Sequence, residues 1–334
     1  MHENTADERA QPTRRPTIID VAEHAGVSKS LASRALRNDP GVSERRRASV
    51  LDAAAELGYR TNSAARSLVR GKSGLIGVVL NEIGNQHHTA VVAGVEAHAA
   101  TVESSVIIGH GGNDATALQR QIDTMIELRV DGLVVVSSWV PCDVLARVGR
   151  EVPTVVVSRL DAPPPEIDTI CSDDFAGAVM AAEHLAALGR RRIAYVTKST
   201  SATSKARARG MRSGAAAAGL DCEVYEFGRD ARCVRDIVRA HDGILCNNDP
   251  TAAEVAGLAR DEEVDVPGEL ALIGYDDTPL AQLTHPRLTS VGQPQYRMGL
   301  RAGVAVSERL GGRTTALREL YAPTLVMRSS APRP

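Results

Sequence analysis

Cysteine is scarce in this sequence, and its spacing argues against its two common structural uses. The 334 residues include five cysteines, Cys142, Cys171, Cys222, Cys233 and Cys246. Because the number is odd and no Cys-x-x-Cys pair occurs, neither a disulfide framework nor a zinc site is expected. His87, His88 and His110 are conceivable metal ligands, but their spacing fixes no coordination geometry. The sequence therefore predicts no metal and no cofactor.

Long apolar runs are also missing. No stretch of about eighteen apolar residues occurs, so neither a membrane-spanning segment nor a membrane partner is expected. Residues 1–15 are polar and of mixed charge, without the apolar centre of a secretory signal. The cytoplasm is therefore the expected location.

Signatures of common nucleotide-binding and hydrolytic enzymes are absent. Residues 109–112 are glycine-rich but lack the Gly-x-Gly-x-x-Gly spacing, which argues against a Rossmann-type enzyme. The segment 71–73 resembles the end of a phosphate-binding loop, but Arg66 stands where the leading glycine should be. No Gly-x-Ser-x-Gly nucleophile elbow occurs, and the adjacent Asp276 and Asp277 are expected to point in different directions. We assign no catalytic residue and predict that the chain is not an enzyme.

Charge is distributed unevenly along the chain. Residues 1–73 contain 13 Lys+Arg and 9 Asp+Glu, a balance of +4, whereas the remainder has 26 and 32, a balance of −6. A basic N-terminal part on an acidic body is typical of a protein that binds a polyanion at one end only.

The basic part has the pattern of a helix-turn-helix. Thr17 can cap a first helix that ends at Gly26, and Ser28 can cap a second helix through Arg37. Small apolar residues on both helices allow a close crossing. The exposed face of the second helix would present Lys29, Ser30, Ser33 and Arg34 to base edges and phosphates. A third helix is expected from the Ser43 cap to Leu57. The alternative is a plain helical bundle fragment.

This N-terminal part closely resembles the head of the LacI/GalR family of bacterial repressors. The matching segments are Asp20-Val-Ala-Glu-His-Ala-Gly-Val-Ser28, Ser33-Arg34, Val42-Ser43, Leu57-Gly-Tyr59, Asn62 and Ala64-Ala-Arg-Ser-Leu68. The resemblance implies a homodimer whose paired heads bind a near-palindromic operator DNA duplex. By position, Lys29 and Ser30 would select bases, Arg34 would add a groove contact, and Thr17, Ser28 and Ser33 would hold phosphates.

The resemblance also implies a linker that folds over the minor groove. Asn62 would cap a short helix, Ala65 would face the groove, and Leu68 would be wedged between base pairs. Thr61 stands where the family usually has proline, which makes the start of the linker less rigid. The alternative is a flexible tether.

The body alternates strand and helix patterns twice. Strands are expected at 75–80, 105–108, 132–136, 154–157, 193–196, 243–246 and 270–273, and helices at 90–100, 115–129, 144–150, 175–188, 206–218 and 251–260. Short apolar runs separated by helices indicate parallel sheets covered on both faces. Two such lobes place a ligand in the cleft between them, at the carboxyl ends of the strands.

The expected fold is therefore an all-α helix-turn-helix head plus an α/β two-lobed body, which the resemblance specifies as periplasmic-binding-protein-like (type I). The expected domains are a DNA-binding domain at 14–61, a hinge helix or linker at 62–73, an N-lobe at 74–172 plus 293–321, and a C-lobe at 173–292 plus 322–330.

Polar residues that follow strands are candidates for holding a small effector, a sugar or a derivative of one. Arg207 matches the family's effector-binding arginine, and its planar fork can bridge two hydroxyls or a carboxylate. Trp139 is expected near the cleft mouth. Where the family often has Asn-Pro-Phe-Phe, this chain has Asn85-Gln-His-His88, so imidazole hydrogen bonding replaces aromatic stacking. The candidate effector-binding residues are His88, Ser158, Arg207, Asn248, Asp276 and Gln293.

The sequence of the body allows two other interpretations. A sugar-binding protein of the transport type would have a secretory signal and no DNA-binding head. A sugar-active enzyme carrying such a head would need a nucleophile with its base, or paired carboxylates. The favoured reading is a transcriptional repressor that its effector releases from DNA. The chain ends soon after residues 327–330 without a heptad repeat, which favours a dimer.

Overall fold

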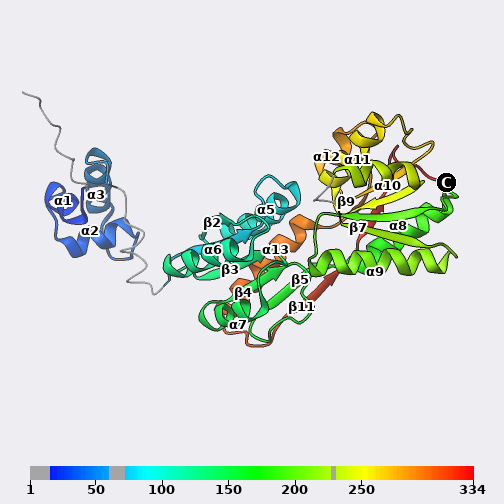
Figure 1. Cartoon of the computed structure of the whole chain (residues 1–334). Coiled ribbons are helices and arrows are strands. Elements are labelled where there is room, and N and C mark those ends of the chain that lie inside the picture. Colours follow the sequence, from blue (N-terminus) through cyan, green and yellow to red (C-terminus); the bar gives the residue numbers. More distant parts are fainter. Residues whose placement is uncertain (1–15, 60–71, 227–230) are drawn as a thin grey trace, which may run out of the picture. The chain divides into compact units, whose positions relative to one another are not determined.

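The computed structural model describes residues 16–59, 72–226 and 231–334, in two units, Met1–Ser73 and Gly74–Pro334. Within its described residues the first unit has three helices, α1 (Ile18–His24), α2 (Lys29–Leu36) and α3 (Glu44–Glu56) (Figure 1). Of the predicted DNA-contacting residues, Asn62, Ala65 and Leu68 lie outside the described residues.

Local capping explains where α1 and α2 begin. The Thr17 hydroxyl oxygen accepts the Asp20 backbone N–H, and the Asp20 carboxylate accepts the Thr17 backbone N–H at 2.6 Å, which completes a capping box. Gly26 adopts a φ of +65°, a conformation that glycine takes without steric cost. Ser28 Oγ then accepts the Leu31 backbone N–H at 3.2 Å and starts α2. The predicted helix-turn-helix is confirmed.

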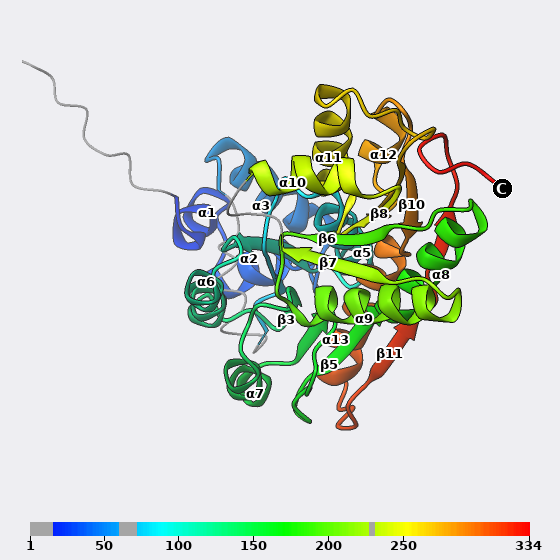
Figure 2. The same ribbon diagram turned by 45° about the vertical axis from the view of Figure 1, so that its right-hand side comes forward.

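The second unit contains two mostly parallel sheets of six strands each (Figures 1 and 2). The first has the order β11-β5-β4-β3-β1-β2 and the second the order β12-β10-β9-β8-β6-β7, in which only β12 is antiparallel to its neighbour. The first comprises β1 (Leu75–Leu80), β2 (Ser105–His110), β3 (Gly132–Val136), β4 (Thr154–Val157), β5 (Asp168–Ser172) and β11 (Arg318–Tyr321). The second comprises β6 (Ile193–Thr197), β7 (Cys222–Glu226), β8 (Gly243–Cys246), β9 (Ala271–Asp276), β10 (Thr289–Gly292) and β12 (Thr324–Val326).

Helices cover both faces of each sheet, and four apolar clusters fill the layers between them. In the first lobe, α5 (Gln86–Thr101) and α13 (Gln295–Leu310) cover one face, and α6 (Ala115–Glu127) and α7 (Cys142–Glu151) the other. In the second lobe, α8 (Asp174–Ala187) and α9 (Ala202–Ala217) cover one face, and α10 (Ala231–Ala240), α11 (Asp249–Asp261) and α12 (Pro279–Leu283) the other. The predicted two-lobed α/β body is confirmed. Among the described residues, no helix is long and apolar enough to span a membrane.

The chain crosses between the lobes three times, after β5, after β10 and after β11. The return segment α13 therefore packs beside α5 although the two helices are about two hundred residues apart in sequence. Their backbones approach closely because glycines line the contact. A Cβ on Gly94 would lie 2.1 Å from the Tyr296 carbonyl oxygen, and one on Gly299 would lie 2.0 Å from that of Val91.

Asp168 ties this return segment to the first sheet. Its buried carboxylate accepts hydrogen bonds from Arg309 of α13, from Arg313, and from the Leu317 backbone N–H at 2.8 Å. Burial alone would raise the pKa of Asp168, but the bonds from Arg309 and Arg313 outweigh it and hold the pKa at about 2. The ion pairs therefore stabilise the crossing of the chain back into the first lobe.

We predict that Asp168→Asn lowers the free energy of unfolding by at least about 2 kcal/mol near neutral pH. The pKa of Asp168 in the folded protein lies below the ordinary value of 3.8, so the stabilisation is complete above about pH 4 and is lost as pH falls towards 2. Urea titrations of the wild type and of Asp168→Asn between about pH 2 and about pH 7 measure the difference in the free energy of unfolding. The matched control is Asp161→Asn, which changes an exposed carboxylate. An equal effect of both substitutions would refute the role of Asp168.

Candidate functional site

A cleft between the two lobes opens where strands of both sheets end. Its cavity has a volume of about 470 Å³ and is lined from both lobes. Val136 and Val157 are the last residues of β3 and β4, Asn247 directly follows β8, and Asp276 ends β9. Parallel α/β sheets place their ligands at this edge, because loops and helix N-termini converge there.

The structure brings most of the predicted effector residues together in this cleft. His88, Ser158, Arg207, Asn248 and Asp276 line the cavity. Gln293 lies behind the lining, where its Nε2 donates to Asp276 Oδ1 at 2.6 Å. Gln293 therefore positions Asp276 in this structure. Asn248 caps α11, since its Oδ1 accepts the backbone N–H and the hydroxyl of Thr251 at 3.0 and 2.7 Å.

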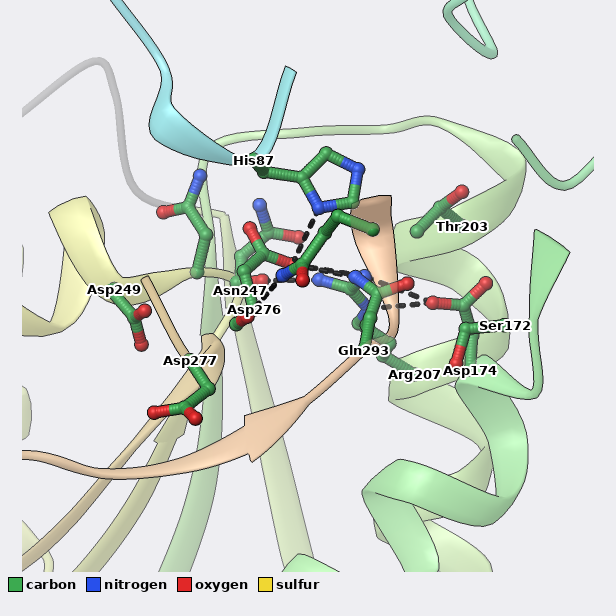
Figure 3. Close-up of polar contacts among 12 residues, drawn as sticks. His87, Ser172, Asp174, Thr203, Arg207, Asn247, Asp249, Asp276, Asp277 and Gln293 are labelled. Carbon is green, nitrogen blue, oxygen red and sulfur yellow. Dashed lines mark hydrogen bonds and ion pairs between the residues drawn. The ribbon is translucent and has the colours of Figure 1, made fainter. Parts of the chain in front are cut away.

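Arg207 is a buried cation at the centre of a network that the sequence did not predict (Figure 3). Its side chain is 5% exposed, and both Nε and Nη2 lie 2.9 Å from Asp174 Oδ1. Nη1 donates to the Asn247 carbonyl oxygen, and the guanidinium carbon lies 3.4 Å from the centre of the Tyr275 ring. Burial opposes the charge, but Asp174, Tyr275 and Asp276 raise the pKa of Arg207 above its ordinary value. Because arginine has five N–H groups, two remain for a ligand.

His87 is the main residue of the cleft that the sequence analysis did not identify as an effector contact. It comes from the first turn of α5, and its Nδ1 lies 3.6 Å from Asp276 Oδ1 of the opposite lobe (Figure 3). Burial lowers the pKa of His87 to about 4, so the imidazole is neutral at physiological pH. The adjacent His88, also in the cleft, makes a hydrogen bond to the Glu82 carbonyl oxygen at 3.0 Å. The His87-His88 pair in the sequence was the available signal.

Further polar contacts join the lobes across the cleft. Gln86 Oε1 accepts the Leu280 backbone N–H at 3.1 Å, and the hydroxyls of Ser158 and Thr203 are 3.5 Å apart. Together with the approach of His87 to Asp276, they hold the lobes in the arrangement shown.

Asp276 and Asp277 adopt an uncommon backbone conformation. Their φ angles are 98° and 50°, a region that residues other than glycine rarely occupy and that is often found at ligand sites. As expected, the two carboxylates point in different directions (Figure 3). Asp276 faces Arg207 and Gln293, whereas Asp277 pairs with Arg328 at 2.6 Å.

Trp139 also lines the cleft, and its ring packs against an apolar cluster of the first lobe. The conceivable metal ligands do not converge, because His87 and His88 line the cavity whereas His110 does not. Within the described residues, no group of three His, Cys, Asp or Glu side chains could hold a metal ion.

In the head, Lys29 and Ser30 are exposed at the start of α2, and Ser33 and Arg34 are half-buried. Two of these side chains make bonds within the head. Arg34 Nη2 donates to the Pro40 carbonyl oxygen at 2.7 Å, and Ser33 Oγ accepts from Arg37 Nη1 at 2.7 Å. The hydroxyls of Thr17 and Ser28 serve as helix caps. Lys29 and Ser30 are therefore the predicted contacts that remain free to reach base edges.

A helix-turn-helix head joined to a two-lobed body with a polar inter-lobe cleft defines a DNA-binding transcriptional regulator. Residues 17–62 match the family described as bacterial regulatory proteins, lacI family, and residues 182–331 match the periplasmic binding protein-like domain. The HTH-type transcriptional regulator GalR of Escherichia coli K12 is 31% identical over 95% of this chain and 96% of its own length. The chain belongs to the LacI/GalR family.

Other relatives and solved structures agree with this assignment. The HTH-type transcriptional repressor CytR of E. coli K12 is 27% identical over 89% of this chain and 90% of its own. The lac repressor dimer bound to operator and an anti-inducer matches the fold with a TM-score of 0.83 at 23% identity, covering 96% of this chain and all of that one. The transcriptional regulator CelR in complex with cellobiose matches with a TM-score of 0.68 at 24% identity, covering 95% of this chain and all of that one. The curated relatives are DNA-binding regulators rather than enzymes.

We predict that Asp174→Asn destabilises the body by about 3 kcal/mol, because it leaves the buried Arg207 without its main partner. The matched control is the neighbouring Asp173→Asn. Asp173 caps α8 through the Ala176 backbone N–H, and asparagine caps a helix equally well. Urea unfolding of the full chain measures both variants. Equal stability of the two would show that the Arg207 pair contributes little.

Proposed function

We propose that the chain is a repressor whose affinity for operator DNA is controlled by a small neutral polyhydroxylated effector, a sugar or a derivative of one. The observation that carries this proposal is the convergence of Arg207 of α9 with Asp276 and Asn248, which stand at strand ends. These three residues face His88 and Ser158 of the first lobe. Hydroxyl groups can both donate and accept, and this set offers both functions from two sides.

The charges in the cleft favour a neutral ligand. Arg207 is paired with Asp174, and Lys198 is paired with Glu254, whose Oε1 lies 2.7 Å from Nζ. His87 is neutral because burial lowers its pKa to about 4. The cations of the cleft therefore have carboxylate partners already, and an ionic ligand would have to compete with them. Solved structures of the same fold are described with cellobiose and with ribose bound.

The proposed mechanism couples the cleft to the head. An effector that binds one arrangement of the lobes better shifts the population towards it, and the first lobe transmits the change to the linker. We propose the lobes as 74–172 plus 293–321 and 173–292 plus 322–330, and the linker as 62–73. In a homodimer, paired linkers carrying Asn62, Ala65 and Leu68 would meet over the minor groove. Release of DNA is the proposed response to the effector. We propose no catalytic step, so the ligand would leave unchanged.

We predict that Lys29→Ala weakens binding to a duplex selected from random sequences by about tenfold, or about 1.4 kcal/mol. Binding to a scrambled duplex should weaken less, because Lys29 is proposed to contact bases. Gel-shift titrations at fixed salt measure both affinities. The control is Arg191→Ala, which removes an exposed cation of the body. No preference of the wild-type chain for any duplex would refute the function itself.

We predict that the effector changes the fluorescence of Trp139, the single tryptophan of the chain, since this residue lines the cleft. Neutral sugars, nucleosides and their phosphates form the screen. Arg207→Lys keeps the charge but loses the planar fork, so a true effector should bind it at least about tenfold more weakly. Arg260→Lys, at an exposed position of α11, is the control. Equal affinities for the two variants would exclude Arg207 as a contact.

A further inference from the structure

A second cavity lies on the side of α9 that faces away from Arg207. Its volume is about 540 Å³, and it is bordered by α9, by the loop after β6 and by the end of β7. Lys205, Arg209 and Arg212 line it, at a spacing that places neighbouring side chains on one helical face. All three are exposed, and Glu226 is the one carboxylate residue of the lining. The charge balance of the lining is therefore +2.

These cations have no side-chain partner among the described residues. Some arginines elsewhere in the body do pair with carboxylates, as Arg147 does with Asp123 and Arg150 with Glu166. The side chains of Lys205, Arg209 and Arg212 form no ion pair or hydrogen bond in the part of the chain that the structure describes. Like charges at these spacings disfavour a helix. Among the described residues that line the cavity, the single carboxylate of Glu226 opposes this repulsion.

The position of the cations within α9 adds to this cost. Lys205 is the fourth residue of α9, near the positive end of the helix dipole, and the first turn holds no acidic residue. An anion at this place would reduce both the mutual repulsion and the unfavourable interaction with the dipole. Hydroxyl groups complete the lining, from Ser199 and Thr200 of the loop and from Thr197 and Ser204. Cations with hydroxyl donors form the usual environment of a bound phosphate or carboxylate.

The second cavity and the effector cleft share a wall. Ser199 lines both, and α9 carries Arg207 on one side and the three cations on the other. The hydroxyls of Ser204 and Tyr195 are 3.0 Å apart, and Tyr195 donates to Asn247 Oδ1 at 3.0 Å. The backbone carbonyl oxygen of Asn247 in turn accepts from Arg207 Nη1. A ligand in the second cavity would thus lie one hydrogen-bonded layer from the effector cleft.

We propose that this second cavity binds a small dianion, a phosphate monoester or a dicarboxylate, as a second ligand on the helix that carries Arg207. The dianion matches the +2 balance of the lining. Binding of the dianion needs no effector, so it can be tested before any effector is known.

The test uses the full chain with inorganic phosphate, glycerol phosphate and malonate at constant ionic strength, followed by calorimetry and by the thermal unfolding midpoint. The double variant R209Q/R212Q should bind the preferred dianion at least about tenfold more weakly, since it removes two of three cations. The control R191Q/R260Q removes two exposed arginines elsewhere in the body and should bind like the wild type.

Each arm decides a different point. Preference for glycerol phosphate assigns a phosphate monoester, and preference for malonate assigns a dicarboxylate. Binding that does not saturate would overturn the proposal. Equal affinity of R209Q/R212Q and R191Q/R260Q for the dianion would place the anion elsewhere and overturn it too. Unchanged circular dichroism of R209Q/R212Q shows that the variant is folded, and the milder single variant K205Q then tests the same site with one charge removed.

Discussion

The buried guanidinium of Arg207 is the constraint on which the cleft depends. A charge this deep is tolerated only when it is paired and hydrogen-bonded, and its partners come from separate elements. Asp174 begins α8, Asn247 follows β8, and Tyr275 and Asp276 end β9. Arg207 therefore holds these three ends at one point and leaves two N–H groups for a ligand. The same residue joins the packing of the second lobe to its proposed binding function.

Much of the fold could be predicted because its signals are local. The strands Leu75–Leu80, Gly132–Val136, Thr154–Val157 and Gly243–Cys246 have the predicted bounds, since each is a short apolar run between polar turns. Boundaries shifted where a cap was overlooked. The helix expected from residue 90 begins at Gln86, because Asn85 caps it. Five strands were missed, namely β5, β7, β10, β11 and β12. β7 and β11 are edge strands with alternating exposure, whereas β5 (Asp-Thr-Ile-Cys-Ser) and β10 (Thr-Ser-Val-Gly) lie inside their sheets but contain no continuous apolar run.

The candidate site could be predicted only in part. Residues that follow strands, such as Asp276, were found because strand ends converge in every sheet of this type. Asp174 and His87 were not predicted as site residues, because their roles depend on partners far away in sequence. Asp174 is 33 residues from Arg207, and His87 meets Asp276 from the other lobe. Gln293 was found as a candidate but acts one layer behind the cavity. Which polar residues touch a ligand and which hold its neighbours depends on tertiary packing.

The contacts that span the cleft suit a sensor because, within the described residues, none of them joins two charged side chains. Ser158 meets Thr203 at 3.5 Å, Gln86 accepts one backbone N–H, and a neutral imidazole lies 3.6 Å from Asp276. A strong ion pair across the lobes would fix one arrangement regardless of ligand. Without such a pair, an effector that binds another arrangement better needs only a few kcal/mol of preference to change the populations. The imidazoles of His87 and His88 therefore supply polarity at the cleft without a charge that would lock it.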